Sequence, residues 1–275
     1  MLNFAHICPT AYIQQYAQYN SIHLILAHLV EEDEQYRDFY YNLKDSKFKI
    51  MDNSAFEMYK QGKPMYDSSK LIEMGKACRA DYIVMSDYPA EPWTKTSTAA
   101  ENLISKIKDN GFKTFYCPQS EIGKTDDLLE AIEWGIDNKG IDLIGISILN
   151  TPNAFGVERN NNLQRYLSRY EIFRLLRERR PPCDKTYKRF HCLGMVDGPK
   201  EIILLKQLFK HYIFSWDSSA AIWSGIHEIS FDNSPTGLIN GKFEKEVNFQ
   251  HDIPLTHPQD TTIIQNIEYI NRLLK

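Results

Sequence analysis

The feature of this sequence that most limits its fold is a regular alternation of short apolar segments with longer amphipathic ones. The apolar segments are rich in β-branched and aromatic residues and are predicted to be strands. They span residues 2–8, 23–29, 48–51, 81–85, 113–117, 142–149, 189–195 and 212–216. Between them, apolar residues recur at helical spacing, as at Leu103, Ile104 and Ile107. Strands that alternate with helices in this way form a parallel sheet covered by helices.

The length of the chain distinguishes between the architectures that such a sheet can adopt. A (β/α)8 barrel of ~250 residues fits the 275 residues better than an open doubly wound sheet does. No Gly-x-Gly-x-x-Gly follows the first strand, which disfavours a dinucleotide-binding fold. No linker or low-complexity segment divides the chain. We therefore predict an α/β fold, a single-domain (β/α)8 TIM barrel over residues 1–275, in which 226–275 form irregular strands, loops and a closing helix.

Polar side chains stand at the carboxyl ends of most of the predicted strands. The residues are Asp52, Asp87, Gln119, Ser147, Asn150, His191 and Asp217. The carboxyl ends of barrel strands meet at one rim, where active sites lie. Taken singly, each of these residues could instead be an ordinary turn residue, and Asp217 could simply cap the turn that follows it. Together they predict an active site with Asp217 as the catalytic carboxylate.

Two carboxylates facing one substrate can divide the chemistry of glycosyl transfer. One attacks a sugar carbon and forms a covalent intermediate, and the other manages protons. A further Asp and a Gln can bind the hydrogen-bonding edge of a heterocycle, because one accepts and the other both donates and accepts. This set of residues suits an enzyme that exchanges one base for another on a sugar.

The order of the strand-end motifs strengthens this interpretation. They are 51–57 (MDNSAFE), 83–87 (IVMSD), 118–120 (PQS), 144–148 (IGISI), 191–195 (HCLGM) and 216–219 (WDSS). Over residues 45–225, roughly, their order resembles that of the tRNA-guanine transglycosylases and their DNA-acting 7-deazaguanine relatives in phages and bacteria.

The resemblance implies a role for each matching residue. Asp217 would be the nucleophile that attacks C1′ of a guanosine and expels guanine, and Asp52 the general acid and base. Asp87 and Gln119 would bind the purine edge, with backbone groups near Ser147. Further substrate-binding candidates are Asn53, Phe56 and His191, although a lone strand histidine is more often a core residue. A 7-deazaguanine base then replaces guanine with net retention at C1′, and no cofactor is implied.

The sequence also departs from the family pattern. The glycines that follow the first Asp are replaced by Asn53, Ser54 and Ala55, and a Gly-Gly turn is reduced to Gly145 with Ser147. The Cys-x-Cys-x-x-Cys…His zinc module is absent, since the five cysteines have the wrong spacing for a closed tetrahedral site. In the tRNA enzymes this module supports tRNA binding, so DNA is the preferred polymer here and RNA the alternative.

One basic stretch, residues 159–189, stands out in a chain with a net charge of −4. The candidate phosphate-binding residues are Arg159, Arg165, Arg169, Arg174 and Arg177. They fall on or next to a helix predicted over 163–180, with Leu167, Tyr170, Phe173 and Leu176 inward. Arginines at the barrel mouth would bind phosphates through charge and bidentate contacts. The alternative is a solvated helix face in which Glu171 and Glu178 pair locally.

Other function classes are disfavoured. No apolar run approaches the ~18 residues that span a bilayer, no secretory signal is evident, and no Cys-x-x-Cys occurs, so we predict a cytoplasmic protein with free thiols and no membrane partner. His6, His23 and His28 lack the His-x-His pair of barrel metalloenzymes, and no metal site is predicted. Two alternatives stay open: a barrel glycosidase or deoxyribosyltransferase acting on free nucleosides, and a non-catalytic nucleic-acid-binding subunit.

Overall fold

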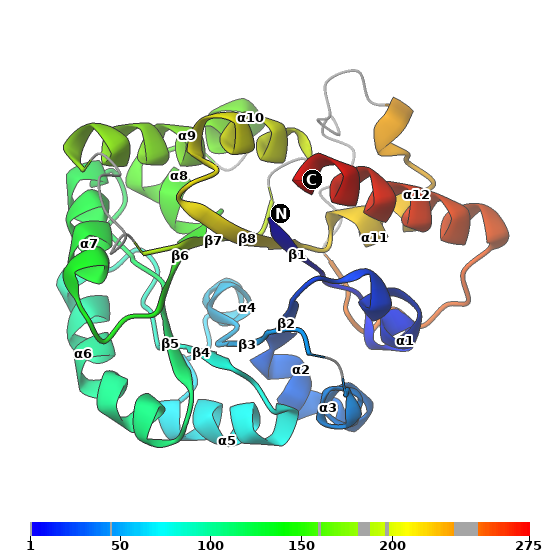
Figure 1. Ribbon diagram of the computed structural model, residues 1–275, viewed down its shortest axis with the longest axis horizontal. Helices are drawn as coiled ribbons and strands as arrows, with labels where there is room; N and C mark the ends of the chain where they lie inside the picture. The colour runs from blue at the N-terminus through cyan, green and yellow to red at the C-terminus, as the bar shows by residue number, and fades with distance from the viewer. Residues whose placement is uncertain (1, 45, 159–160, 181–187, 196–197, 234–246) are drawn as a thin grey trace.

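Eight parallel strands form a nearly closed barrel surrounded by helices (Figure 1). The computed structural model describes residues 2–44, 46–158, 161–180, 188–195, 198–233 and 247–275. The strands are β1 Asn3–His6, β2 His23–Leu26, β3 Lys49–Asp52, β4 Tyr82–Val84, β5 Lys113–Tyr116, β6 Leu143–Ser147, β7 Phe190–Leu193 and β8 Ile213–Ser218. Their order around the barrel is β1-β8-β7-β6-β5-β4-β3-β2. The predicted single-domain (β/α)8 architecture is therefore confirmed.

Helices connect successive strands and cover the outside of the barrel. The α-helices are α1 Ile13–Tyr16, α2 Ala27–Glu32, α3 Glu34–Asn42, α4 Ala55–Gln61, α5 Ser68–Cys78, α6 Trp93–Asp109, α7 Thr125–Asp137, α8 Asn150–Ala154, α9 Asn162–Arg179, α10 Lys200–Phe209, α11 Ala220–Ile226 and α12 His257–Leu274. Short 3-10 turns occur at η1 Thr10–Tyr12, η2 Ala17–Tyr19 and η3 Phe231–Asn233.

The two ends of the strand order, β1 and β2, are joined by the residues just ahead of β2. The backbone N–H of Ser21 donates to the carbonyl of Phe4 at 3.0 Å. In return, the N–H of Phe4 donates to Ser21 Oγ at 2.7 Å, and the N–H of His6 donates to Asn20 Oδ1 at 2.7 Å. At the junction between β1 and β2, the Ser21 and Asn20 side chains thus replace part of the missing backbone hydrogen bonding.

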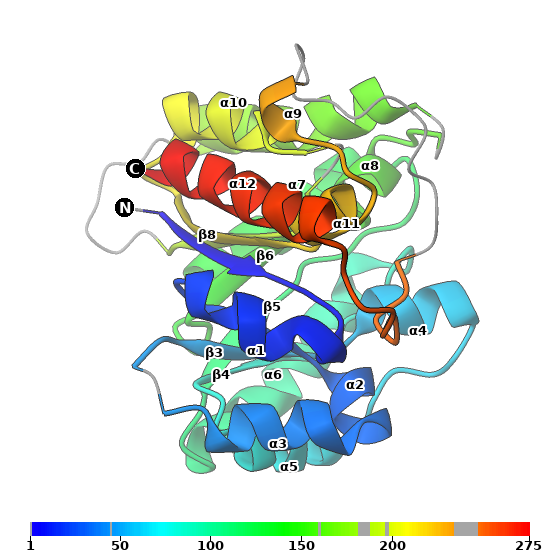
Figure 2. The ribbon, with the colours of Figure 1, turned by 90° about the vertical axis from the view of Figure 1, so that its right-hand side faces the viewer.

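The closing helix predicted for the end of the chain is α12. It packs against α11, α10 and β1, and Figure 2 shows it running between α10 and β1. Thr256 and Gln259 form a capping box at its start. Strands were also predicted for 226–275, but the described residues of this region form no strand. Residues 234–246 lie outside the described part of the chain.

Alternate strand residues point into the barrel, and they form the floor of the site. Asp52, Ser147, Leu193 and Asp217 face inward at the carboxyl ends of their strands. Strand β8 contains an irregularity, because Phe190 pairs with Ile213 whereas the next residue, His191, pairs with Ser215. A bulge of this kind re-aims the residues that follow it.

Gly145 lies in the middle of β6, at a point where the barrel interior has no room for a side chain. A Cβ there would lie 2.4 Å from Cε2 of Phe115 and 2.9 Å from Cδ1 of Leu193. Gly145 lies within residues 142–149, which were predicted to be a strand, and the structure confirms a strand there, whose glycine makes space for the Phe115 ring.

We expect Gly145→Ala to lower the free energy of unfolding by about 1–3 kcal/mol, because the added methyl group overpacks the barrel interior. Urea unfolding measures the loss. Phe115→Leu is the matched partner, since it removes the ring atoms that the methyl group meets. Gly145→Ala should lower the free energy of unfolding less in the Phe115→Leu background than in the wild type. A Gly145→Ala protein as stable as the wild type would contradict the packing described here.

Candidate active site

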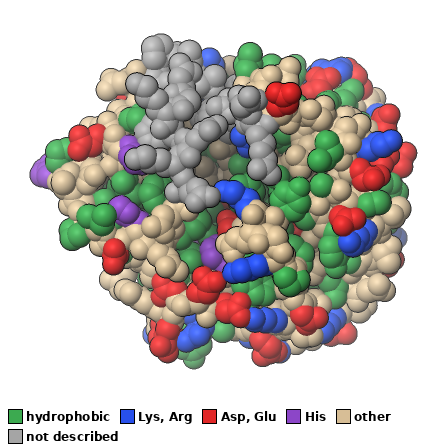
Figure 3. Space-filling view, turned by 180° about the vertical axis from the view of Figure 1, so that it is seen from behind, with side chains coloured by type: hydrophobic (Ala, Val, Ile, Leu, Met, Phe, Trp, Pro, Cys, Tyr) green, Lys and Arg blue, Asp and Glu red, His purple; other side chains and the backbone are tan. Residues whose placement is uncertain are grey.

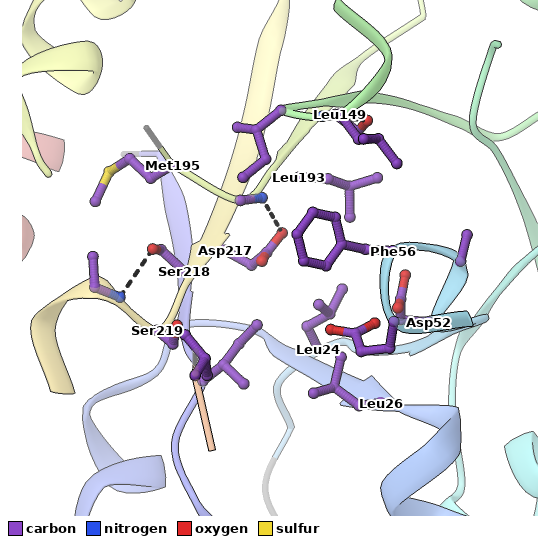
Figure 4. A pocket seen from close by; sticks show the side chains of 18 of the residues that line it. Leu24, Leu26, Asp52, Phe56, Leu149, Leu193, Met195, Asp217, Ser218 and Ser219 are labelled. Carbon is purple, nitrogen blue, oxygen red and sulfur yellow. Dashed lines mark hydrogen bonds between the residues drawn. The ribbon is translucent and has the colours of Figure 1, made fainter. Parts of the chain in front are cut away.

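A cavity of about 360 Å³ lies at the carboxyl ends of the strands. Figure 4 shows Asp52 and Asp217 on its walls, with Phe56 and Leu193 near them. Of the strand-end residues predicted to act here, all but Asn150 and His191 line this cavity, together with Asn53 and Phe56: the set is Asp52, Asn53, Phe56, Asp87, Gln119, Ser147 and Asp217. The Asn150 amide instead donates to the carbonyl of Pro118. A cavity of this size accommodates one small ligand. The expectation that Asp52 and Asp217 share one cavity is met.

Asp217 lies near the end of β8, and one of its carboxylate oxygens is held by two N–H groups. Oδ1 accepts a hydrogen bond from Nε2 of His191 at 2.8 Å and another from the backbone N–H of Gly194 at 3.1 Å (Figure 4). The Asp217 side chain is 6 % exposed, and that exposure is toward the cavity. Charge-assisted hydrogen bonds to a carboxylate are the stronger kind and fix its orientation.

Asp52, at the end of β3, has a different environment. Its Oδ2 accepts the backbone N–H of Ser54 at 2.9 Å. Burial raises the pKa of Asp52 well above its usual value, and the nearby Glu57 carboxylate raises it further. Asp52 therefore keeps a proton at pH values where a free aspartic acid has lost it. Two carboxyl groups in one cavity with different surroundings can act separately as proton donor and nucleophile.

Glu57 is a site residue that the sequence analysis quoted within a motif but did not assign. It lies in the first turn of α4 and lines the cavity. Burial raises its pKa, and the charge of Asp217 adds to this effect. Glu57 could have been predicted from its position five residues after Asp52. The helix that follows a barrel strand begins at the same rim, so an acid in its first turn can face the cavity.

The turn between β3 and α4 adopts the backbone conformation that a glycine would. Ser54 has φ 55°, in the left-handed region. Its hydroxyl lies 2.9 Å from Nδ1 of His28 and accepts the His28 backbone N–H at 3.2 Å. Local hydrogen bonds therefore hold a residue other than glycine in this strained conformation.

Asp87, Gln119 and Asn53 form one buried group at the side of the cavity. The Asp87 carboxylate accepts Nδ2–H of Asn53 at 2.6 Å and also Nε2–H of Gln119. Asn53 donates as well to the carbonyl of Met85 at 2.8 Å, so its amide holds the protein rather than a substrate. Gln119 Oε1 is buried with no hydrogen-bond partner among the described residues. It is an acceptor that a ligand N–H can satisfy.

Two other predicted substrate-binding residues have structural roles. The Ser147 hydroxyl accepts the backbone N–H groups of Leu149 and Asn150 at 3.1 and 3.0 Å, which shapes the turn after β6. His191 is fully buried and is not on the cavity wall. The prediction that His191 binds substrate does not fit this position, because the ring lies behind Asp217 and contacts it. Phe56, in contrast, is 39 % exposed at the cavity.

The basic helix α9 differs most from its prediction. Arg169 is 1 % exposed, pairs with Glu201 at 3.1 Å and donates to the carbonyls of Leu193 and Gly194. It is therefore unavailable to bind phosphate, and that prediction is corrected. Leu167 was predicted to face inward, but it is 41 % exposed. The inward face instead follows Arg169, Ile172, Phe173 and Leu176, a helical i, i+3, i+4, i+7 row.

The other predicted arginines are only partly available to a phosphate. Arg174 pairs with Glu171 at 2.6 Å and also with Glu178, which is the local pairing considered as the alternative. The Arg177 guanidinium lies 5.2 Å from the centre of the Phe209 ring. Arg165 lies in the first half of α9. Arg159 lies outside the described residues.

The end of the barrel that carries the cavity presents a mixed surface. Figure 3 shows a hollow near the middle of this face, with hydrophobic side chains beside it and acidic and basic side chains interspersed around it. At the cavity itself, Lys60 Nζ lies 5.2 Å from the centre of the Phe56 ring. An exposed aromatic ring with a lysine above it is a surface on which a base and a phosphate can both be bound.

The described residues contain neither a candidate metal site nor a candidate membrane span. Within the described ranges, no group of three or more His, Cys, Asp or Glu residues is placed to hold a metal ion. No helix in those ranges is both long and apolar enough to cross a bilayer. The four cysteines that the structure describes, Cys8, Cys78, Cys117 and Cys192, are buried free thiols.

Comparisons with protein-family models and with curated proteins find no match to this chain. The features that bear on function are therefore those of the site itself: its buried acids, its exposed aromatic ring and the Gln119 amide oxygen that has no partner among the described residues. The resemblance to the guanine transglycosylases stays a prediction from the order of the motifs.

The buried Asp87 predicts a pH dependence of stability. Burial raises its pKa to about 6, above the ~3.9 of an exposed Asp in the unfolded chain. The folded state then holds the Asp87 proton more tightly, so this contribution to stability is complete below about pH 4 and is lost as the pH rises through about 6. We expect the free energy of unfolding to fall by about 3 kcal/mol over this range.

Urea unfolding at a series of pH values measures the Asp87 contribution. Asp87→Asn is the matched variant, because it cannot titrate and its amide can still pair with a rotated Gln119 amide. Asp52 and Glu57 titrate in both proteins. The difference in unfolding free energy between the wild type and Asp87→Asn therefore reports the titration of Asp87 alone. Parallel pH profiles for the two proteins would show that Asp87 does not titrate in this range.

Proposed function

We propose that this protein is a transglycosylase that exchanges guanine in nucleic acid, with DNA preferred, for a 7-deazaguanine base through a covalent aspartyl-glycosyl intermediate. The observation that carries the proposal is the convergence of Asp217 and Asp52 on one cavity at the carboxyl ends of the strands. The two residues have different surroundings there, as glycosyl transfer through a covalent intermediate requires of its nucleophile and its acid.

The first step is attack by the Asp217 carboxylate on C1′ of the target nucleoside. The bond from C1′ to N9 of guanine breaks, and its electron pair leaves with the base. Asp52 supplies a proton to the departing base, consistent with the raised pKa that burial and Glu57 produce. The sugar is then held as an ester of Asp217.

The second step reverses the first with a different base. The incoming 7-deazaguanine gives up its N9 proton to the Asp52 carboxylate and attacks C1′, and the ester bond to Asp217 breaks. Both carboxyl groups return to their starting states. Each step inverts C1′, so the product keeps the original configuration.

Base recognition is assigned to the group around Asp87 and to Phe56. The unpartnered Oε1 of Gln119 supports a ligand N–H at that position, and a guanine edge carries such donors. The exposed ring of Phe56 supports contact with the flat face of a purine, which is worth about 1–3 kcal/mol per base by stacking. A polymer substrate has to turn its target nucleotide out of the helix to reach the cavity.

A deoxyribosyltransferase acting on free nucleosides is the second candidate. The observation that favours it is the internal pairing of Arg169 and Arg174, which removes two of the five predicted phosphate-binding arginines. The chemistry at Asp217 and Asp52 would be the same, and only the size of the substrate would differ.

Mass spectrometry of nucleosides tests the proposal. DNA and tRNA from cells that express the protein and are supplied with 7-deazaguanine bases are digested and compared with those from cells expressing Asp217→Asn. We expect a 7-deazaguanine nucleoside in DNA with the wild type only. Its appearance in tRNA would change the polymer, and exchange only on free nucleosides in vitro would favour the second candidate. No exchange on any of these substrates would reject both.

A further inference from the structure

The reactive carboxylate of Asp217 has two oxygens in different environments. Oδ1 accepts two hydrogen bonds, from His191 Nε2 at 2.8 Å and from the Gly194 N–H at 3.1 Å. Among the residues that the structure describes, none donates a hydrogen bond to Oδ2. Asp217 lines the cavity, so Oδ2 is the oxygen left to meet a substrate.

His191 is held in the orientation that presents an N–H to Asp217. A carboxylate oxygen only accepts, so Nε2 has to carry the proton in this contact. The other ring nitrogen, Nδ1, lies 2.6 Å from Oγ of Ser215. Both His191 and Ser215 are 0 % exposed, so no solvent competes for these groups. The bulge in β8 places Ser215 directly opposite His191, which makes the contact possible.

The second donor, the N–H of Gly194, belongs to a backbone segment that is fixed by the Arg169–Glu201 ion pair. Arg169 donates to the carbonyl of Leu193 at 2.6 Å and to that of Gly194 at 3.0 Å. Glu201 pairs with Arg169 at 3.1 Å. Gly194 itself has φ 69°, and a Cβ there would lie 2.8 Å from Ile148. The peptide that points at Asp217 is thus held by two carbonyl contacts and a glycine conformation.

We infer that His191, oriented by Ser215, and Gly194, anchored by Arg169, are positioning residues that lock Oδ1 of Asp217 and leave Oδ2 as the atom that bonds to C1′. This inference rests on the proposed function for its chemistry. Neither His191 nor Arg169 touches the substrate. They act by holding the carboxylate in one rotamer, and a misplacement of about 1 Å in a reacting group costs on the order of 100-fold in rate.

Two amide variants of His191 separate positioning from mere packing. Glutamine places its amide nitrogen near the position of Nε2 and keeps a donor to Asp217, whereas asparagine places its amide near Nδ1 and keeps only the Ser215 side. We expect His191→Asn to slow covalent adduct formation about 100-fold, with substrate affinity unchanged and with His191→Gln restoring most of the rate. His23→Asn is the control, a buried strand histidine packed on Tyr40, away from the cavity.

The assay is the rate at which the protein forms a denaturant-stable adduct with a guanine-containing substrate, with melting temperature measured in parallel. Equal adduct rates for His191→Asn and the wild type overturn the inference. Equal losses in His191→Asn and His191→Gln at matched melting temperature also overturn it, because they show that ring packing, and not the donor, is what matters.

A spectroscopic test is independent of activity, and its deciding measurement is made on the wild type. In ¹⁵N-histidine-labelled wild-type protein, we expect NMR to show a proton on Nε2 of His191, and a change of that signal in Asp217→Asn and in Ser215→Ala. A spectrum in which Nε2 carries no proton overturns the inference. If the wild type forms no adduct at all, the proposed function fails, and the NMR result still decides whether His191 holds Asp217.

Discussion

Replacing Asp217 by asparagine is expected to abolish the covalent intermediate and to lower base exchange by about 10⁴–10⁶-fold, the range observed when a nucleophile or its partner is removed from a hydrolase. Asparagine keeps the shape of the side chain, and its carbonyl oxygen still accepts from His191 and Gly194. The loss therefore falls on the chemistry and not on the fold.

The measurement is trapping of the protein on a guanine-containing oligonucleotide in a denaturing gel, with labelled guanine exchange as the second assay. Asp52→Asn is the matched control, because it removes the other acid of the cavity. We expect it to slow exchange by about 10²–10⁴-fold, as for loss of a general acid, while the Asp217 adduct still forms. An Asp217→Asn protein that exchanged base at a near wild-type rate would assign the nucleophile to another residue.

Replacing Arg169 by methionine is expected to lower the free energy of unfolding by about 3–5 kcal/mol, because it removes the positive charge that faces the buried Glu201 carboxylate. Both side chains are 1 % exposed. The carbonyls of Leu193 and Gly194 lose their donors in the same variant. We also expect slower adduct formation, because the Gly194 N–H that contacts Asp217 is no longer anchored.

Urea unfolding measures the stability of this variant, and Glu201→Gln and the double variant complete a cycle. The two single losses should sum to more than the loss in the double variant, since the groups act as a pair. Arg174→Met is the control: its partners Glu171 and Glu178 are at the surface of α9, and exposed ion pairs contribute little to stability. If Arg169→Met lost nucleic-acid affinity but no stability, the original prediction of a phosphate contact would be reinstated.

Much of the candidate site could be predicted because its signals are local. Asp52, Asp87, Gln119 and Asp217 each follow an apolar strand segment, and parallel strands bring their carboxyl ends to one rim. Glu57 was missed because it lies one helical turn beyond its strand. Its approach to the cavity depends on the direction in which α4 leaves β3, and that direction is set by the left-handed backbone of Ser54.

The errors concern residues whose role depends on rotation or on a distant partner. The arginines of the basic stretch were predicted to bind phosphates at the barrel mouth, but Arg169 faces the barrel because the apolar row Ile172, Phe173 and Leu176 sets the rotation of α9. His191 was assigned to substrate, but it lies one inward residue below the rim and contacts Asp217 from behind.

The sequence by itself determined the order of strands and helices, the barrel and the acids at its rim, because hydrophobic period and strand-end chemistry are properties of neighbouring residues. Only the tertiary structure decided which oxygen of Asp217 is held, which arginine is buried and which acid joins Asp52. Those outcomes depend on contacts between segments far apart in the chain, and the free energy of burying a charge or a histidine is set by the partner that it meets there.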